Sequence, residues 1–277
     1  FLDPSPMVKN FDNTKFIYSI FDIEHRELNK LTEFSKEIAL QRDVDYQHAC
    51  KNCSCLIVGT KKLKEEVSKI YEIEKHKVFN VIFPPPIITA NKGCDVNILK
   101  KINNPQIKFN YLLYPAQFWS HKNHKYIIEA VSYLKTKNNF DMKVIFTGHD
   151  KGNLSNIKSL ISQKQIEDNF IFFDYVKNED LFQLYENCAA VIIPTLVAPH
   201  TFPLYEAFFF RKPVIYNTKV LDESLKDKVI SLNVDKIDDL DSALKKINDK
   251  DRIKKMTDLN YKYFQDIFGD NILEQKL

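Results

Sequence analysis

The sequence predicts an α/β protein with two domains, each built on an open parallel β-sheet flanked by helices. Short apolar runs, of the length of buried strands, alternate with amphipathic stretches of helical spacing along nearly all 277 residues. Parallel strands need crossover connections, and helices usually supply them, so this alternation indicates parallel sheets. One proline-rich and then polar segment interrupts the alternation and divides the chain in two.

The first domain is expected to span residues 1–86 and to be only partial. A doubly wound domain usually has five or six strands, and this region offers about three. Thr60 has the side chain of a helix N-cap. The expected strands are 15–21, 54–58 and 77–83, and the expected helices are 31–52 and 61–71.

A linker is expected at residues 87–108. It follows Pro84, Pro85 and Pro86, which fit neither a helix interior nor a central strand. It is polar, rich in asparagine, and contains a glycine and a further proline.

The second domain, residues 109–277, is expected to be complete, with six strands. Its last helix is expected to pack back on the first domain. The expected strands are 109–114, 142–147, 170–173, 190–193, 213–216 and 229–231; the expected helices are 122–137, 153–164, 179–187, 203–210 and 236–248, with one or two more from residue 252.

Composition excludes several classes of protein. No window of eighteen apolar residues occurs, which argues against a transmembrane helix. The net charge of +3 suits an anionic small molecule or an anionic membrane surface, but is lower than that of a typical nucleic-acid-binding protein.

The cysteines indicate a reducing compartment. Five cysteines without a secretory signal favour reduced thiols in the cytosol, although the chain begins at Phe1 and its natural start is expected upstream. Cys50, Cys53 and Cys55 lack the second ligand pair of a structural zinc site.

Ligands of open α/β sheets bind beyond the carboxyl ends of the strands, so the loops there are the places to search. The first, Tyr114-Pro-Ala-Gln-Phe-Trp-Ser-His-Lys-Asn-His124, should have Ser120 as a cap and Lys122 in the first helical turn. A lysine opposes the helix dipole there, which makes sense if it binds an anion; the alternative is an ordinary surface lysine. His121 and His124 lack a third metal ligand and are expected at the surface or as caps.

Two further loops carry unusual residues. Gly148 directly follows a strand, as expected where backbone must approach a ligand closely. Pro203 is expected as the first residue of a helix whose free N–H groups, around residues 200–202, can hold an anion. Glu206 lies one turn further on in an apolar helix, so its carboxylate needs a partner, and sugar hydroxyls would serve. The alternative is that Glu206 interacts only with the dipole of its own helix. Neither a dinucleotide-binding nor a P-loop glycine motif occurs.

At these loops the chain resembles the family 4 (group 1) retaining glycosyltransferases, which have the GT-B fold of two Rossmann-like domains. The 114–124 segment is similar to the Y-P-A-Q-F-W-P-H-K-N-H of the polysaccharide and lipopolysaccharide branch. Thr-Phe-Pro-Leu-Tyr-Glu-Ala, from Thr201, followed by Lys-Pro-Val-Ile resembles the family's G-L-P-x-x-E-A…x-P-V-I. Phe21-Asp-Ile-Glu-His-Arg, with Glu-Phe-Ser from Glu33, resembles H-D-L-Q-H-R…P-E-F-F-S of the acceptor domain.

The resemblance implies a role for each matching residue. Lys122 would hold the donor diphosphate, and His200, Thr201 and Phe202 would offer backbone amides to it. Glu206 would hydrogen-bond the nucleotide ribose, Val176 would present backbone to the base, and Gly148 would line the same site. His25 is the nearest candidate for an acceptor-side catalytic histidine, because the family's usual position falls on Phe21.

The chain also departs from the family pattern. The arginine that usually partners the lysine is Gln117, and the first glutamate of the usual pair falls on Ala198. Arg211 takes the place of a glycine at a helix C-terminus, where a left-handed conformation costs an arginine roughly 1 kcal/mol. Some branches of the family share the first two changes.

The implied reaction moves a sugar from a UDP- or GDP-sugar to a hydroxyl of a saccharide or lipid-linked acceptor, with retention and without a metal. Asp43-Val-Asp45 matches the Asp-x-Asp of metal-dependent glycosyltransferases, but so short a match is expected by chance. No nucleic acid partner is expected. The expected location is cytoplasmic, with peripheral contact at the inner membrane face as a hypothesis. The alternatives are another GT-B enzyme, such as an epimerase or phosphorylase, and a non-catalytic nucleotide-sugar-binding or scaffold domain.

Overall fold

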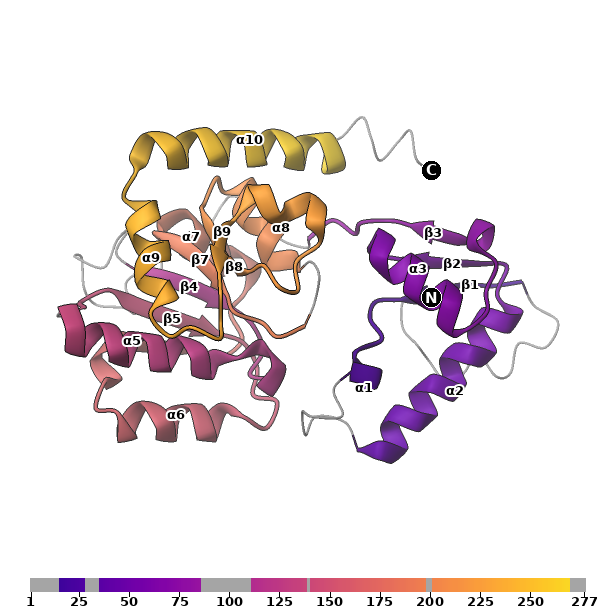
Figure 1. The fold of residues 1–277 in the computed structure, drawn as a ribbon, viewed down its shortest axis with the longest axis horizontal. Helices are drawn as coiled ribbons and strands as arrows, with labels where there is room; N and C mark the ends of the chain where they lie inside the picture. The colour runs from indigo at the N-terminus through magenta and orange to yellow at the C-terminus, as the bar shows by residue number, and fades with distance from the viewer. Residues whose placement is uncertain (1–14, 28–34, 86–110, 139, 198–200, 270–277) are drawn as a thin grey trace. The chain divides into compact units, whose positions relative to one another are not determined.

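The computed structural model describes residues 15–27, 35–85, 111–138, 140–197 and 201–269, and it confirms the α/β fold class with parallel sheets. The chain divides into two compact units, Phe1–Phe83 and Pro84–Leu277. Figure 1 colours the first unit in indigo and purple and the second from magenta to yellow. The expected linker and Cys94 lie outside the described residues.

The first unit is built on a three-stranded parallel sheet in the order β1-β2-β3. Thr60 caps α3, as predicted, because its hydroxyl accepts a 2.9 Å hydrogen bond from the Leu63 amide. The third strand is shorter than predicted: it ends at Asn80 and not at residue 83. The elements are β1 (Ile17–Ile20), α1 (Glu24–Glu27), α2 (Lys36–Asn52), β2 (Cys55–Val58), α3 (Lys61–Ile70), the 3₁₀ turn Lys75–Lys77 and β3 (Val78–Asn80).

The second unit is built on a six-stranded parallel sheet in the order β6-β5-β4-β7-β8-β9. Its strands are β4 (Tyr111–Pro115), β5 (Lys143–Thr147), β6 (Phe170–Phe173), β7 (Ala190–Ile193), β8 (Val214–Asn217) and β9 (Ile230–Leu232). Its helices are α5 (His124–Asn138), α6 (Leu154–Gln163), α7 (Asn178–Asn187), α8 (Phe202–Phe209), α9 (Asp239–Ile247) and α10 (Lys250–Phe268), with 3₁₀ turns at Ser120–Lys122, Glu167–Asn169 and Glu223–Lys228.

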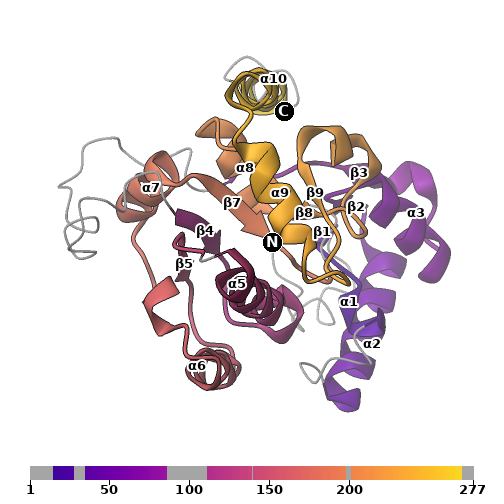
Figure 2. The same cartoon turned by 60° about the vertical axis from the view of Figure 1, so that its left-hand side comes forward.

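Helices cover both faces of this second sheet, which explains its continuous apolar strands. All four residues of β7 and of β8 are buried. Figure 2 shows α5 and α6 on one face and α7 and α8 on the other, with α10 lying over α8. The order reverses beside β4, whose neighbours are β5 and β7, and this reversal is where an open parallel sheet leaves a crevice at its carboxyl edge. None of the helices in the described ranges combines the length and apolar composition that crossing a bilayer requires.

Candidate functional site

Three loops beyond the carboxyl ends of β4, β5 and β6 are bonded to one another through backbone. The Phe118 amide donates to the His149 carbonyl at 3.0 Å, and the Gly148 amide donates to the Phe173 carbonyl at 3.3 Å. A further bond of 3.2 Å runs from the Thr147 hydroxyl to the Asp174 carbonyl. The loops therefore form one surface.

A fourth loop, after β7, is bonded to the turn that carries Lys122. The Leu196 amide donates to the His121 carbonyl at 2.8 Å, and the Asn123 side-chain amide donates to the Pro194 carbonyl at 3.2 Å. These bonds hold the Ser120–Lys122 turn beside the chain segment that leads to α8. The residues on either side of the strand-order reversal are thus joined at the carboxyl edge.

Lys122 lies outside the helix that the sequence predicts for it. It ends the 3₁₀ turn Ser120–Lys122, and α5 begins only at His124. The reason is Asn123, whose left-handed backbone (φ 56°) interrupts the helix. The Lys122 side chain is half-buried, and its carbonyl accepts a 2.7 Å hydrogen bond from the Tyr114 hydroxyl. The position of this lysine is therefore fixed by strand β4 rather than by α5.

The expectation that His121 and His124 lie at the surface or cap a helix is wrong. The His124 side chain is fully buried, with its ring 4.8 Å from that of Tyr114, 4.9 Å from Phe118 and 5.0 Å from Phe146. Burial lowers its pKa to about 3, so the imidazole is neutral. His121 is 8% exposed. His124 serves as an aromatic core residue beneath the loop.

Gly148 is needed for packing between two loops of the protein. Its backbone has φ 151°, and a Cβ at this position would lie 2.5 Å from the Ala116 carbonyl oxygen and 2.8 Å from the Gln117 amide nitrogen. The close approach that the sequence suggested is therefore made by the loop after β4. Gly148 lets the loops after β4 and β5 touch.

Gln117 occupies the position of the missing arginine and supports a tryptophan. Its Oε1 accepts a 3.0 Å hydrogen bond from the Trp119 indole. The ammonium of Lys151, from the loop after β5, lies 5.7 Å from the centre of the same indole ring. Gln117 and Lys151, from neighbouring loops, thus contact the same indole.

The start of α8 carries the remaining predicted donor-site residues that the structure describes. Thr201 is its N-cap, but the hydroxyl makes no capping bond, is buried, and has no partner among the described residues. Phe202 is the first helical residue and 45% exposed, with Pro203 second, one position later than expected. His200 lies outside the described residues. Val176 is half-buried between β6 and α7.

Glu206 finds its partner inside the protein. It is 6% exposed, and the Tyr185 hydroxyl, from α7, donates a 2.5 Å hydrogen bond to its Oε2. Burial raises the pKa of Glu206 from 4.5 to about 7, although the bond from Tyr185 opposes this. The carboxyl therefore changes its charge near neutral pH.

The left-handed conformation expected at Arg211 is confirmed, with φ 51°. The guanidinium pairs with Asp258 of α10 and lies 4.1 Å from the ring centre of Tyr261. These contacts tie the end of α8 to α10, and they offset the backbone cost of an arginine at this position.

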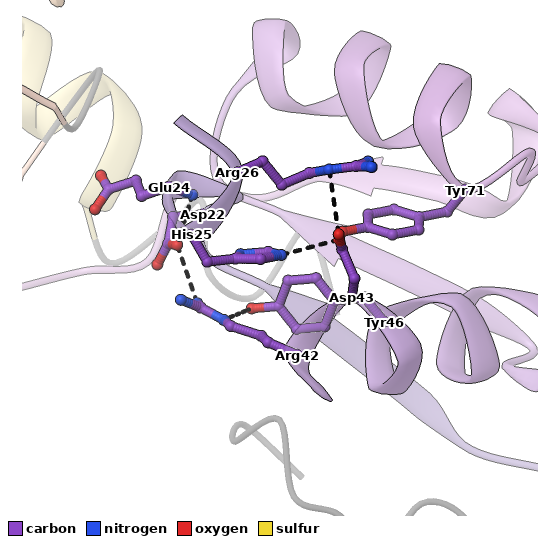
Figure 3. Close-up of polar contacts among 8 residues, drawn as sticks. All are labelled: Asp22, Glu24, His25, Arg26, Arg42, Asp43, Tyr46 and Tyr71. Carbon is purple, nitrogen blue, oxygen red and sulfur yellow. Dashed lines mark hydrogen bonds and ion pairs between the residues drawn. The ribbon is translucent and has the colours of Figure 1, made fainter. Parts of the chain in front are cut away.

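In the first unit, His25 belongs to a polar cluster that follows β1. Figure 3 shows this cluster converging from the segment after β1, from α1, from α2 and from the end of α3. The His25 cluster consists of Asp22, His25, Arg26, Arg42, Asp43, Tyr46 and Tyr71.

The cluster holds His25 away from solvent. The imidazole side chain has no exposed surface; its Nε2 lies 3.0 Å from Asp43 Oδ1, which also accepts a 2.7 Å bond from the Tyr71 hydroxyl. Burial lowers the pKa of His25, so Nε2 of the neutral ring donates to Asp43. Its Nδ1 has no partner among the described residues. The ring therefore presents neither nitrogen to solvent in this conformation.

The two carboxylates of the Asp43-Val-Asp45 motif have different partners. Asp43 points into the His25 cluster, whereas Asp45 accepts a 2.9 Å bond from Gln41 on the same helix. No group of three or more histidine, cysteine or acidic side chains is placed to hold a metal in the described part of the chain. Cys50 and Cys53 are free, buried thiols, and burial raises the pKa of Cys50 to about 12 and that of Cys53 to about 11. They are core residues.

Sequence reasoning missed three residues that matter at these sites. Tyr185, Tyr71 and Lys151 stand in unremarkable helix or loop contexts, and each acquires its role through a tertiary contact. A tyrosine on a helix face carries no local sign of a carboxylate partner 21 or 28 residues away.

Comparison with solved structures shows the same fold at low sequence identity. A variant of S. aureus TarM in complex with UDP matches with TM-score 0.69 and 16% identity over 96% of this chain. Anabaena HepE in complex with UDP-glucose matches with TM-score 0.72 and 15% identity over 95%, and WaaG, a glycosyltransferase of lipopolysaccharide biosynthesis, with 0.69 and 17% over 91%. The chain spans 50% of TarM, 70% of HepE and 71% of WaaG.

Sequence comparison identifies the family. No curated protein matches the chain significantly. The family model for glycosyl transferases group 1 matches residues 95–263, which is more than half of the sequence and includes all four loops of the candidate donor site. The chain therefore belongs to the group 1 glycosyl transferases.

Proposed function

We propose that the protein transfers a sugar from a nucleoside diphosphate sugar to a hydroxyl of a saccharide acceptor, with retention of the anomeric configuration, in polysaccharide or lipopolysaccharide synthesis. Residues 109–277 are the donor-binding part and residues 1–86 the acceptor-side part. HepE binds UDP-glucose and WaaG acts in lipopolysaccharide biosynthesis, which supports this substrate class.

The observation that carries the proposal is the bonded pair of loops at the carboxyl edge. The Leu196–His121 and Asn123–Pro194 bonds bring the turn of Lys122 to the segment that leads into α8. An ammonium group and a helix N-terminus on neighbouring segments favour the same ligand, a compact anion with several oxygens. A diphosphate has this chemistry.

In the reaction, the bond between the sugar C1 and the diphosphate breaks and negative charge gathers on the leaving group. Lys122 and the backbone amides of residues 200–202 stabilise that charge, which is where fixed dipoles lower the barrier most. Glu206 accepts from the ribose, Val176 meets the base through backbone, and Gly148 keeps the loops together. No metal is required in this scheme.

Lys151 compensates for the loss of charge at Gln117. The ammonium of Lys151 and the amide of Gln117 contact the same side chain, Trp119. The positive charge that the family usually has on the loop after β4 is thus supplied from the loop after β5. We expect Lys151→Ala to weaken diphosphate binding, though less than Lys122→Ala.

His25 acts as a positioning residue on the acceptor side. Its buried ring joins α1 to α2 through Asp43, while the Glu24 carboxylate is directed away from the cluster (Figure 3). The role of His25 is therefore to hold the segment that follows β1, where an acceptor-side contact is expected.

Nucleotide binding tests the donor site. Thermal unfolding with UDP-, GDP- and ADP-sugars should show stabilisation by the preferred donor, about 2.7 kcal/mol at a hundred times its dissociation constant. Lys122→Ala should abolish most of this shift, and Lys61→Ala, at an exposed position in the first unit, serves as the control. An undiminished shift in Lys122→Ala would remove the assignment.

Transfer assays test the chemistry. Labelled donor should yield a product whose anomeric proton coupling in NMR matches that of the donor, and the rate should persist in EDTA. Inverted product contradicts retention, and inhibition by EDTA that is reversed by a divalent metal contradicts the metal-free scheme. Donor binding without transfer or hydrolysis favours the alternative of a non-catalytic binding domain.

A further inference from the structure

Positive charge is concentrated in one short segment at the end of α9 and the start of α10. Residues 245–255 contain six lysines or arginines and two aspartates, a surplus of four positive charges. The whole chain has a net charge of +3, so the remainder is slightly acidic. All six cationic residues are exposed: Lys245, Lys246, Lys250, Arg252, Lys254 and Lys255.

This segment borders an open cavity of about 370 Å³ with an apolar floor. Val229 and Ile230 are buried in the floor, and Met256 and Leu259 complete it from α10. Lys246, Arg252 and Lys255 line the same cavity. We call these seven residues the basic corner.

The cations of the basic corner are available to a ligand. Lys246, Arg252 and Lys255 form no ion pair with any residue that the structure describes. Asp227, the acidic side chain lining the cavity, lies 3.0 Å from the ammonium of Lys228, which partly neutralises it. The local potential is therefore positive.

One face of α10 combines these cations with exposed apolar surface. Lys255 and Met256 lie three and four residues after Arg252, and Leu259 lies four and three residues after them, so the four residues share a helix face. Leu259 is 59% exposed. A soluble anion gains little from an exposed leucine, whereas the interface of an anionic bilayer accommodates both the cation and the apolar side chain.

The basic corner is well separated, within its own unit, from the candidate donor site. It includes the start of β9, the end of α9 and the start of α10, which mark the amino edge of the parallel sheet. The donor loops occupy the carboxyl edge. A surface bound at the basic corner leaves the donor loops accessible.

We propose that the basic corner docks the protein on an anionic phospholipid surface. Lys246, Arg252 and Lys255 contact lipid phosphates, while Met256 and Leu259 enter the boundary between headgroups and acyl chains. This proposal does not depend on the donor site or on catalysis.

Vesicle flotation of the full chain tests the proposal. Binding to phosphatidylcholine vesicles with about 30% phosphatidylglycerol is expected, with little binding to pure phosphatidylcholine, and it should fall between about 50 and about 500 mM salt. Each cation contributes about five-fold in affinity, so Lys246→Gln, Arg252→Gln and Lys255→Gln together should weaken binding about 100-fold. Leu259→Gln should weaken it several-fold at unchanged charge.

Control variants distinguish a loss of docking from an effect of net charge, and a folding check excludes misfolding. Lys51→Gln, Lys61→Gln and Lys69→Gln remove the same charge from exposed positions of the first unit and should leave vesicle binding unchanged. Thermal unfolding followed by far-ultraviolet circular dichroism, which reports the helices of both units, checks that each variant is folded.

Three results would overturn the proposal. One is equal binding to neutral and anionic vesicles, and another is an equal loss in the control variant. The third is release from vesicles by millimolar inorganic phosphate or by an oligonucleotide, with Leu259→Gln unchanged, since this identifies a site for soluble anions or nucleic acid.

Discussion

The buried carboxyl of Glu206 makes the stability of the second unit depend on pH. Replacing it by glutamine keeps a side chain of the same shape, and the amide oxygen can still accept from the Tyr185 hydroxyl that now donates to Oε2. The substitution removes only the negative charge that appears when the carboxyl ionises. Glu206→Gln therefore isolates the cost of that charge at a site that is 6% exposed.

The size of the expected difference in stability follows from the pKa of Glu206. Glu206 has a folded-state pKa of about 7 against an ordinary value of 4.5, which corresponds to about 3 kcal/mol. Because the folded pKa is raised, the stabilising contribution is fully present below 4.5 and is lost as pH rises through about 7. Wild type and Glu206→Gln should be equally stable near pH 4.5, and the variant should be up to about 3 kcal/mol more stable above pH 8.

The assay is urea unfolding across this pH range, followed by tryptophan fluorescence. Trp119 is the single tryptophan of the chain and lies in the same unit as Glu206, so the signal reports the unfolding of that unit. Glu186→Gln, at an exposed position of α7, provides the control and should show no such trend. A difference between wild type and Glu206→Gln that stays constant from pH 4.5 to pH 8 refutes the reasoning.

Substitutions at three further positions test the backbone of the second unit and the polar cluster of the first. Gly148→Ala should destabilise by about 2 kcal/mol or more, because its Cβ meets the Ala116 carbonyl, and an unchanged urea midpoint contradicts that contact. Arg211→Ala should lower the free energy of unfolding by about 1 kcal/mol, because it loses the contacts with Asp258 and Tyr261. Arg211→Gly should recover most of this loss, because glycine adopts the left-handed backbone without strain. Equal urea midpoints for the two variants count against that strain. Asp43→Asn should increase hydrogen exchange in α1 and β1, and protection equal to wild type removes Asp43 from its holding role.

The strands of the second domain are the part of the fold that is most readable from sequence. The structure reproduces the predicted bounds 170–173 and 190–193, because each is a short, wholly apolar run. All of β7 is buried, whereas β6, at the sheet edge, is mostly half-buried. Helix starts are less readable. The start of α5 is two residues later than predicted, since Asn123 adopts a left-handed backbone that no pattern of apolar residues encodes.

The candidate site shows the same division between local and tertiary information. Loop positions follow from the order of strands, so Lys122 and the start of α8 could be placed at one edge of the sheet from sequence. The burial of His124 could not, because it requires the rings of Tyr114, Phe118 and Phe146 to converge from two strands and a loop. His25 was singled out by its motif, but its enclosure by Asp43 depends on α2 packing against α1.

The hydrogen bond from Tyr185 determines which oxygen of Glu206 can accept from a nucleotide. The tyrosine donates to Oε2, so a ribose hydroxyl that donates to the same carboxyl would use Oε1 and would favour the ionised form. Nucleotide binding should then remove a proton from Glu206, whose pKa without ligand is about 7. The affinity for UDP should fall up to about ten-fold for each pH unit below 7 and level off above it, while that of Glu206→Gln stays flat. Calorimetric titrations with UDP at pH 6, 7 and 8 measure this, and buffers of different ionisation enthalpy reveal the released proton. Equal wild-type affinities at pH 6 and 8, with no proton released, would show that the ribose does not use Glu206.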